Sequence, residues 1–140
     1  MTARQLEWLL EIAAAAQLIV SVVNLWLVRL LGWRVQLERL PLLMREVFRV
    51  HTWFISVTLT IFAVMTWRFA SEMATGANAA CVWLAALVAV FWGFRTVLQM
   101  AYYSASHWRG KLGRTAIHVT LLVVYGGMAL VYGLAAAHGR

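Results

Sequence analysis

The sequence predicts an all-α polytopic membrane protein with four transmembrane helices in an up-down-up-down bundle. Hydrophobic residues make up 64% of the 140 residues and charged residues 12%, against roughly 45–50% and about 25% in soluble domains. A soluble protein this small would have too much surface for so few charges. Four apolar stretches also have about the 20 residues that a helix needs to cross a bilayer. We therefore expect one four-helix membrane domain over residues 1–140, which excludes a soluble enzyme, a disordered tail and a disulfide scaffold.

The four apolar stretches define the expected spans. Their cores are Ile12–Val28, Val50–Phe69, Ala79–Met100 and Ala116–Ala137, and we expect helices over about 5–31, 43–69, 79–103 and 115–137. Each is interpreted as a helix, because every backbone polar group in lipid needs an internal partner. The first span is expected to be retained, since Glu7 and Glu11 interrupt the segment before it and its small residues precede the apolar core, the wrong order for signal cleavage.

Cations concentrate in two of the connections. Residues 29–49 contain Arg29, Arg34, Arg39, Arg45 and Arg49. Residues 101–115 contain Arg109, Lys111 and Arg114. Because Lys and Arg gather on the cytoplasmic side, we expect both connections in the cytoplasm, both termini outside, and a multi-pass protein of a bacterial inner membrane. This distribution accounts for the net charge of +7. No basic helix with interleaved aromatic residues favours nucleic-acid binding.

An amphipathic pattern precedes the second span. Over residues 35–48, apolar side chains recur at Leu37, Leu40, Leu43 and Val47, which predicts a segment lying at the membrane interface. Pro41 suits the first turn of such a helix.

Polar residues inside the spans are costly and need an explanation. In the first span they lie on one helix face: Gln17, Ser21 and Asn24. This face is either a hydrogen-bonded seam to another helix or one wall of a polar cavity. The second span has Thr52, Ser56 and Thr60 at a similar spacing, which favours a packing face whose hydroxyls bond their own backbone. The fourth span has three glycines that allow close helix approach: Gly126, Gly127 and Gly133.

Arg95 and Gln99 lie one turn apart in the third span. Three explanations of Arg95 stay open: its side chain snorkels to the cytoplasmic headgroups, it pairs with Glu46, or it holds an anionic carboxylate, propionate or lipid phosphate.

His51 and His118 each lie about one turn inside the same membrane face, at the starts of the second and fourth spans. In an up-down-up-down bundle these helices run parallel and lie diagonally across the core. If both side chains turn inward, they can ligate the iron of a b-type haem. Arginines at similar depth could neutralise its propionates: Arg45, Arg49, Arg95 and Arg114. The alternatives are a metal ion held by the two histidines, a quinone headgroup held by histidine, arginine and Tyr125, or purely structural histidines.

Other chemistry has little support in the sequence. Cys81 is the single cysteine, which excludes disulfide exchange, an iron–sulfur cluster and a thiolate zinc site. There is also no GxSxG, no HExxH and no intramembrane acid pair, so hydrolytic catalysis is not indicated.

Two motifs carry a resemblance. VFWGFRTVLQ at Val90–Gln99 and REVFRVH at Arg45–His51 resemble a group of small uncharacterised bacterial membrane proteins with four helices, over about Leu30–Gly133. That group has no known activity, so the resemblance implies only the architecture. The layout is also similar to the haem-binding anchor subunits of respiratory complexes, in architecture alone.

These observations support three hypotheses of function. The first is an embedded component of a larger membrane assembly, with electron transfer through b-type haem between His51 and His118. The second is a cofactor-free structural or scaffold subunit. The third is a small lipid- or quinone-binding membrane enzyme centred on Arg95, Gln99 and the tyrosines. The expected partners are membrane lipids and other membrane subunits or further copies of the chain.

Overall fold

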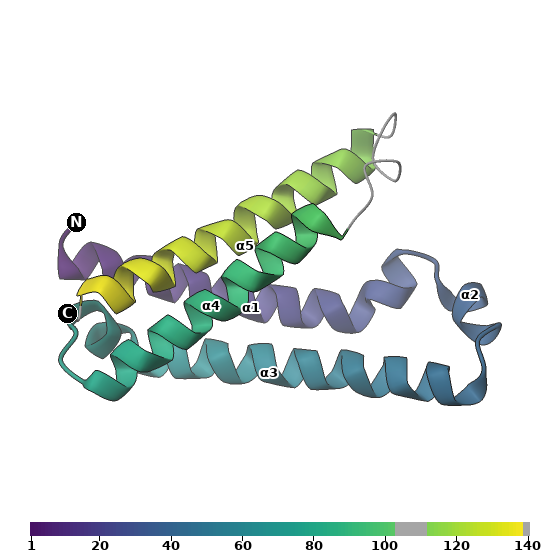
Figure 1. Cartoon of the computed structure of the whole chain (residues 1–140), viewed down its shortest axis with the longest axis horizontal. Helices are drawn as coiled ribbons and strands as arrows, with labels where there is room; N and C mark the ends of the chain where they lie inside the picture. Colours follow the sequence, from purple (N-terminus) through teal and green to yellow (C-terminus); the bar gives the residue numbers. More distant parts are fainter. Residues whose placement is uncertain (103–111, 139–140) are drawn as a thin grey trace. The chain divides into compact units, whose positions relative to one another are not determined.

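Helices account for all regular structure in the part of the chain that the computed structural model describes, namely residues 1–102 and 112–138, with backbone alone at 112–114 (Figure 1). The elements are α1 (Ala3–Leu30), α2 (Arg34–Glu38), α3 (Leu42–Thr75), α4 (Ala79–Ala101) and α5 (Leu112–His138). Within the described residues, four helices are long and apolar enough to cross a membrane: Ala3–Leu30, Leu42–Thr75, Ala79–Ala101 and Thr115–His138. The all-α class and the four spans are confirmed, and the up-down-up-down order stays a prediction.

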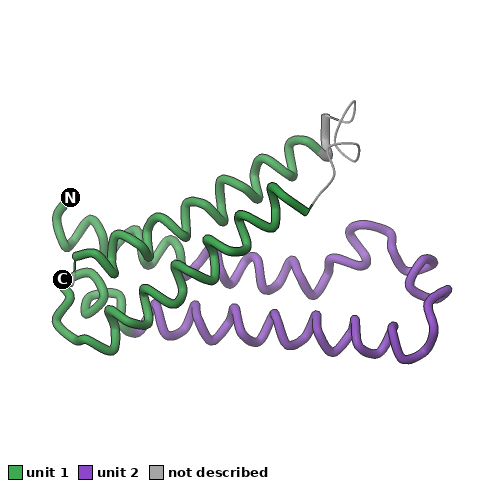
Figure 2. Tube along the Cα trace, viewed as in Figure 1, with its two compact units in different colours: residues 1–13, 69–140 green, residues 14–68 purple. Residues whose placement is uncertain are grey.

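The helices divide into two compact units (Figure 2). One unit contains residues 1–13 and 69–140, and the other contains residues 14–68. Both α1 and α3 have residues in each unit. The second division falls where α3 bends, at Phe69, whose φ of −117° and ψ of 20° are not helical.

In the first unit, α4 and α5 lie side by side and run antiparallel (Figure 1). Their contacts occur in opposite order along the two helices, with Gln99 against His118 and Trp92 against Tyr125. A Cβ atom added at Gly126 would lie 3.9 Å from Cγ2 of Thr96, an ordinary contact, and would meet nothing within 4 Å at Gly127 or Gly133. Of the three glycines, Gly126 therefore faces the α4 side chains.

In the second unit, hydrogen bonds join α1 to α3. Ser21 Oγ donates to the Ser56 carbonyl at 2.8 Å, and Ser56 Oγ donates to the Ser21 carbonyl at 3.1 Å. One turn further along α1, Asn24 Nδ2 donates to the Thr52 carbonyl at 3.0 Å and to Ser56 Oγ at 2.9 Å. At Ser21 and Asn24, the predicted polar face of the first span is thus a hydrogen-bonded seam to α3, and the hydroxyl groups of Ser56 and Thr60 are among its partners.

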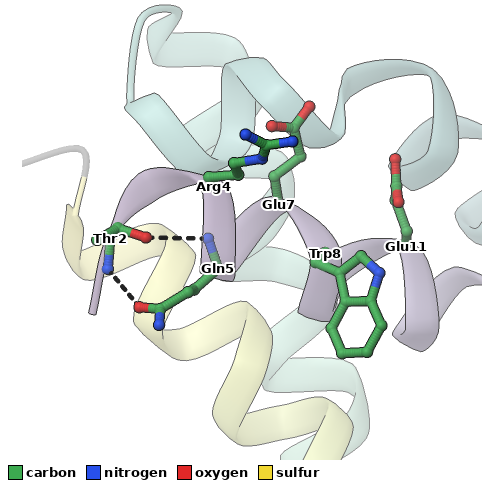
Figure 3. Close-up of a pocket in the computed structure, with 6 residues that line it drawn as sticks. All are labelled: Thr2, Arg4, Gln5, Glu7, Trp8 and Glu11. Carbon is green, nitrogen blue, oxygen red and sulfur yellow. Dashed lines mark hydrogen bonds between the residues drawn. The ribbon is translucent and has the colours of Figure 1, made fainter.

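Local motifs fix where α1 begins and ends. At its start, Thr2 Oγ1 accepts from the Gln5 amide at 3.2 Å while the Thr2 amide donates to Gln5 Oε1 at 2.8 Å (Figure 3). This reciprocal pair is a capping box. At its end, Gly32 has φ of 64° and the Trp33 amide donates to the Val28 carbonyl at 3.0 Å, which is a Schellman motif.

The interfacial segment predicted over residues 35–48 is divided into two pieces. The short helix α2 ends at Glu38, and α3 begins at Leu42. Pro41 directly precedes α3, and its carbonyl accepts the first helical bond from the Arg45 amide at 3.1 Å. Proline therefore stands just before the first turn, because its ring tolerates the start of a helix and not the interior of one.

Candidate functional site

A polar-aromatic cluster occupies the contact between α4 and α5 in the first unit. We define it by five residues: Trp92, Arg95, Gln99, His118 and Tyr125. On α4 the three members are spaced i, i+3 and i+7, and on α5 the two members are spaced i and i+7. These spacings keep each set on one face of its helix. The antiparallel packing then brings the two faces together.

Gln99 and His118 form the hydrogen-bonded end of the cluster. Gln99 Nε2 lies 3.1 Å from His118 Nδ1. Gln99 is 2% exposed, and its Oε1 has no hydrogen-bond partner among the described residues. The placement of the amide oxygen and nitrogen follows from the hydrogen bonds around the group. In the opposite placement, Gln99 Oε1 would accept from a protonated His118 Nδ1, and the Gln99 NH2 group would no longer bond His118. Either placement leaves one polar end of a buried amide open to a further partner.

Tyr125 joins the aromatic and cationic members. Its ring stacks on the buried Trp92 ring, with centroids 5.1 Å apart and planes 27° apart. The Arg95 guanidinium carbon lies 5.0 Å from the centroid of the Tyr125 ring. Such a cation–π contact contributes about 0.5–2 kcal/mol, more when it is desolvated. This contact holds the half-buried Arg95 against the aromatic members of the cluster within the third span.

The other residues predicted for a cofactor lie elsewhere in the chain. His51 and Arg49 are exposed on α3, in the unit of residues 14–68. His51 lines a shallow surface groove together with other side chains of α3: Glu46, Val47, Val50 and Phe54. His118 belongs to the other unit, and the side chain of Arg114 lies outside the described residues. The pairing of His51 with His118 stays a prediction.

A second groove lies at the start of α1 and was not expected from the sequence (Figure 3). It has a volume of about 530 Å³ and is lined by Thr2, Arg4, Gln5, Glu7, Trp8 and Glu11. All of these residues belong to the first turns of one helix or its cap, and Trp8 is 65% exposed. The groove is an open surface feature, so the α4–α5 cluster is the stronger candidate site.

No family model, curated protein or solved structure matches this chain. Among the described residues, no group of three or more His, Cys, Asp or Glu side chains could hold a metal ion. The four apolar helices define a small integral membrane protein that spans the membrane several times and contacts its lipids.

Proposed function

We propose that this integral membrane protein binds a quinone headgroup at the α4–α5 cluster. The carrying observation is the buried Gln99 amide, which bonds His118 with one end and has no hydrogen-bond partner for its Oε1 among the described residues. An unsatisfied buried polar group costs about 1–3 kcal/mol. Water is scarce inside a bilayer, so a lipid-soluble compound with its own hydrogen-bonding group is the natural complement.

The chemistry of the cluster favours a quinone over other lipids. A quinone carbonyl accepts hydrogen bonds, and the corresponding quinol hydroxyl donates them. With the amide as the structure places it, the open Gln99 Oε1 can accept from a quinol hydroxyl. With the opposite placement, the open NH2 group can donate to a quinone carbonyl, so Gln99 serves both forms by turning its amide. The Trp92–Tyr125 pair offers apolar aromatic surface beside these polar groups. Arg95 adds a nearby positive charge that stabilises the electron-rich oxygen of a carbonyl or of a reduced ring.

The proposal is tested by the stability of the purified protein with a short-chain ubiquinone analogue. A ligand that binds only the folded state stabilises it by about 2.7 kcal/mol at a hundredfold excess over its Kd. We expect the analogue to raise the unfolding temperature of the wild type and to leave Gln99→Leu unchanged. Gln36→Leu is the matched control, because Gln36 is exposed on α2, and it should respond like the wild type.

Two outcomes would contradict this proposal. The first is an analogue that stabilises the wild type and Gln99→Leu equally, which would place quinone binding elsewhere. The second is stabilisation by phosphatidylglycerol that depends on Arg95 and not on Gln99, which would make the cluster a phosphate site. In that case the ligand would be a lipid headgroup.

A b-type haem between His51 and His118 is the second proposal. It is favoured by the bond between Gln99 and His118 Nδ1. Histidines that bind a metal usually give their other ring nitrogen to a carbonyl or carboxylate, which fixes the tautomer and the ring orientation. With its oxygen turned to Nδ1, Gln99 would supply such a carbonyl. Electron transfer within a larger membrane assembly is the role that follows from this proposal.

A further inference from the structure

The segment of residues 29–49 runs from the last turn of α1 through α2 to the first turns of α3. It combines four exposed arginines and the half-buried Arg45 with exposed apolar side chains. Residues 29–49 contain five arginines and two glutamates, Glu38 and Glu46, so the segment carries a net charge of +3. Most of its large apolar side chains are exposed, with Leu43 at 71%. A soluble surface rarely has this combination, whereas a segment at the headgroup level of a bilayer needs both kinds of side chain.

Two of the five arginines have partners within the protein. The Arg34 Nε atom lies 3.5 Å from a Glu38 carboxylate oxygen, one turn along α2. The Arg29 guanidinium lies 4.9 Å from the centre of the Trp26 ring. These contacts already involve the first two arginines of the segment, Arg29 in the last turn of α1 and Arg34 in α2.

The other three arginines are different. Among the described residues, Arg39, Arg45 and Arg49 have no acidic partner. Arg45 and Arg49 are one turn apart on α3, a spacing at which like charges repel each other. An anion held between them would turn this repulsion into attraction. Guanidinium groups suit a phosphate especially well, because they offer paired donors in a planar fork.

We propose that Arg45 and Arg49, with Arg39 close in sequence, form a site for the headgroup of an anionic phospholipid of the surrounding bilayer. The exposed apolar side chains between them face the acyl chains, and the guanidinium groups bind the phosphate. Leu42, Leu43 and Met44 supply this apolar contact directly before Arg45. The site lies in the unit of residues 14–68 and is independent of the proposed quinone site.

The test compares two spin-labelled lipids, phosphatidylglycerol and phosphatidylcholine, in phosphatidylcholine vesicles that contain the 140-residue chain. Electron paramagnetic resonance measures the fraction of each lipid that is slowed by contact with the protein. An arginine near the surface favours an anionic lipid by about fivefold, and averaged over all contacting lipids we expect a preference of about twofold or more for phosphatidylglycerol.

The key variant is the double substitution Arg45→Gln/Arg49→Gln. Its matched control, Arg4→Gln/Arg34→Gln, removes the same amount of charge but affects an arginine at the start of α1 and the one paired with Glu38. We expect the preference to fall to nearly one in the first double variant and to persist in the control. Arg45→Lys/Arg49→Lys, which retains the charge, should keep most of the preference and shows that the positions tolerate substitution.

Three results would overturn the proposal. Equal losses in the two double variants would mean that net charge alone attracts the lipid. A wild-type preference of one would mean that the segment does not select headgroups. The lysine variant could also lose the preference at low salt and be partly unfolded, although it keeps the charge. That result would show that the two positions act through the fold and not through binding.

Discussion

At the scale of single residues, Ser56 is the centre of the α1–α3 seam. Its hydroxyl donates to the Ser21 carbonyl and accepts from Asn24, and its carbonyl accepts from the hydroxyls of Ser21 and Thr60. Every one of these groups would otherwise lie in hydrocarbon, where the backbone of another helix is among the few available partners. Ser21 and Asn24 of the first span thus serve helix packing.

This role predicts the effect of Ser56→Ala. The substitution removes the two bonds made by the Ser56 hydroxyl, and interhelical bonds in membranes average about 0.6 kcal/mol each, so we expect a loss of about 1 kcal/mol in the free energy of unfolding. The loss can be measured by unfolding the protein with SDS in mixed micelles.

Thr58→Ala is the control for this prediction. The Thr58 hydroxyl donates to the Phe54 carbonyl of its own helix at 2.9 Å, so its removal should change stability by less than half as much as Ser56→Ala. Equal losses in the free energy of unfolding would show that removal of any hydroxyl from α3 is costly. The hydrogen bonds between α1 and α3 would then contribute no more than a bond within α3.

At the scale of elements, the helix spans could be predicted because long apolar stretches are a direct consequence of the membrane as solvent. The caps carry local signals too. Thr2 and Gln5 have the spacing of a capping box, which a search for that motif would have found. The break between α2 and α3 at residues 39–41 was harder to predict, because the apolar periodicity of residues 35–48 continues through it. Pro41 marked a helix start, but only the structure separates α2 from α3.

Two glycines in different surroundings, Gly32 after the end of α1 and Gly127 inside α5, predict changes in stability of opposite sign. Gly32 has φ of 64° at the end of α1, a conformation that costs a residue with a Cβ about 1–2 kcal/mol. Gly127 lies inside α5, and a Cβ there would meet nothing within 4 Å. We expect Gly32→Ala to lower the free energy of unfolding by about 1–2 kcal/mol and Gly127→Ala to raise it by about 0.5–1 kcal/mol.

The same SDS titration measures both substitutions. If Gly127→Ala lowered stability, the open space at Gly127 would have to be filled by something other than the residues described around it, such as a partner helix against α5. If Gly32→Ala had no effect, the Schellman motif would contribute little to the end of α1.

At the scale of the whole molecule, composition and hydropathy predicted the class of protein but only part of the site. Arg95, Gln99, His118 and Tyr125 were all candidates, and the structure brings them together between α4 and α5. Their pairing depends on the register of two antiparallel helices. Gln99 lies two residues before the predicted connection of residues 101–115 and His118 lies three residues after it, which is the signal that could have revealed the pair. Whether His51 and His118 lie close together depends on contacts between residues far apart in sequence, for which no local pattern exists.

The proposed b-type haem predicts an absorption spectrum. If His51 and His118 ligate the iron, protein purified from haem-replete cells should show a Soret band, and α and β bands after reduction with dithionite. His51→Ala and His118→Ala should each weaken these bands strongly, because axial ligands set the spectrum of the bound haem. His138→Ala is the control, since His138 is exposed at the end of α5, and it should leave the bands intact.

Gln99→Leu should shift or weaken the bands less than the histidine substitutions do, because it loosens the orientation of His118 without removing a ligand. A folded wild-type protein without colour would contradict the haem proposal. It would not contradict the quinone proposal, which rests on the buried Gln99 amide.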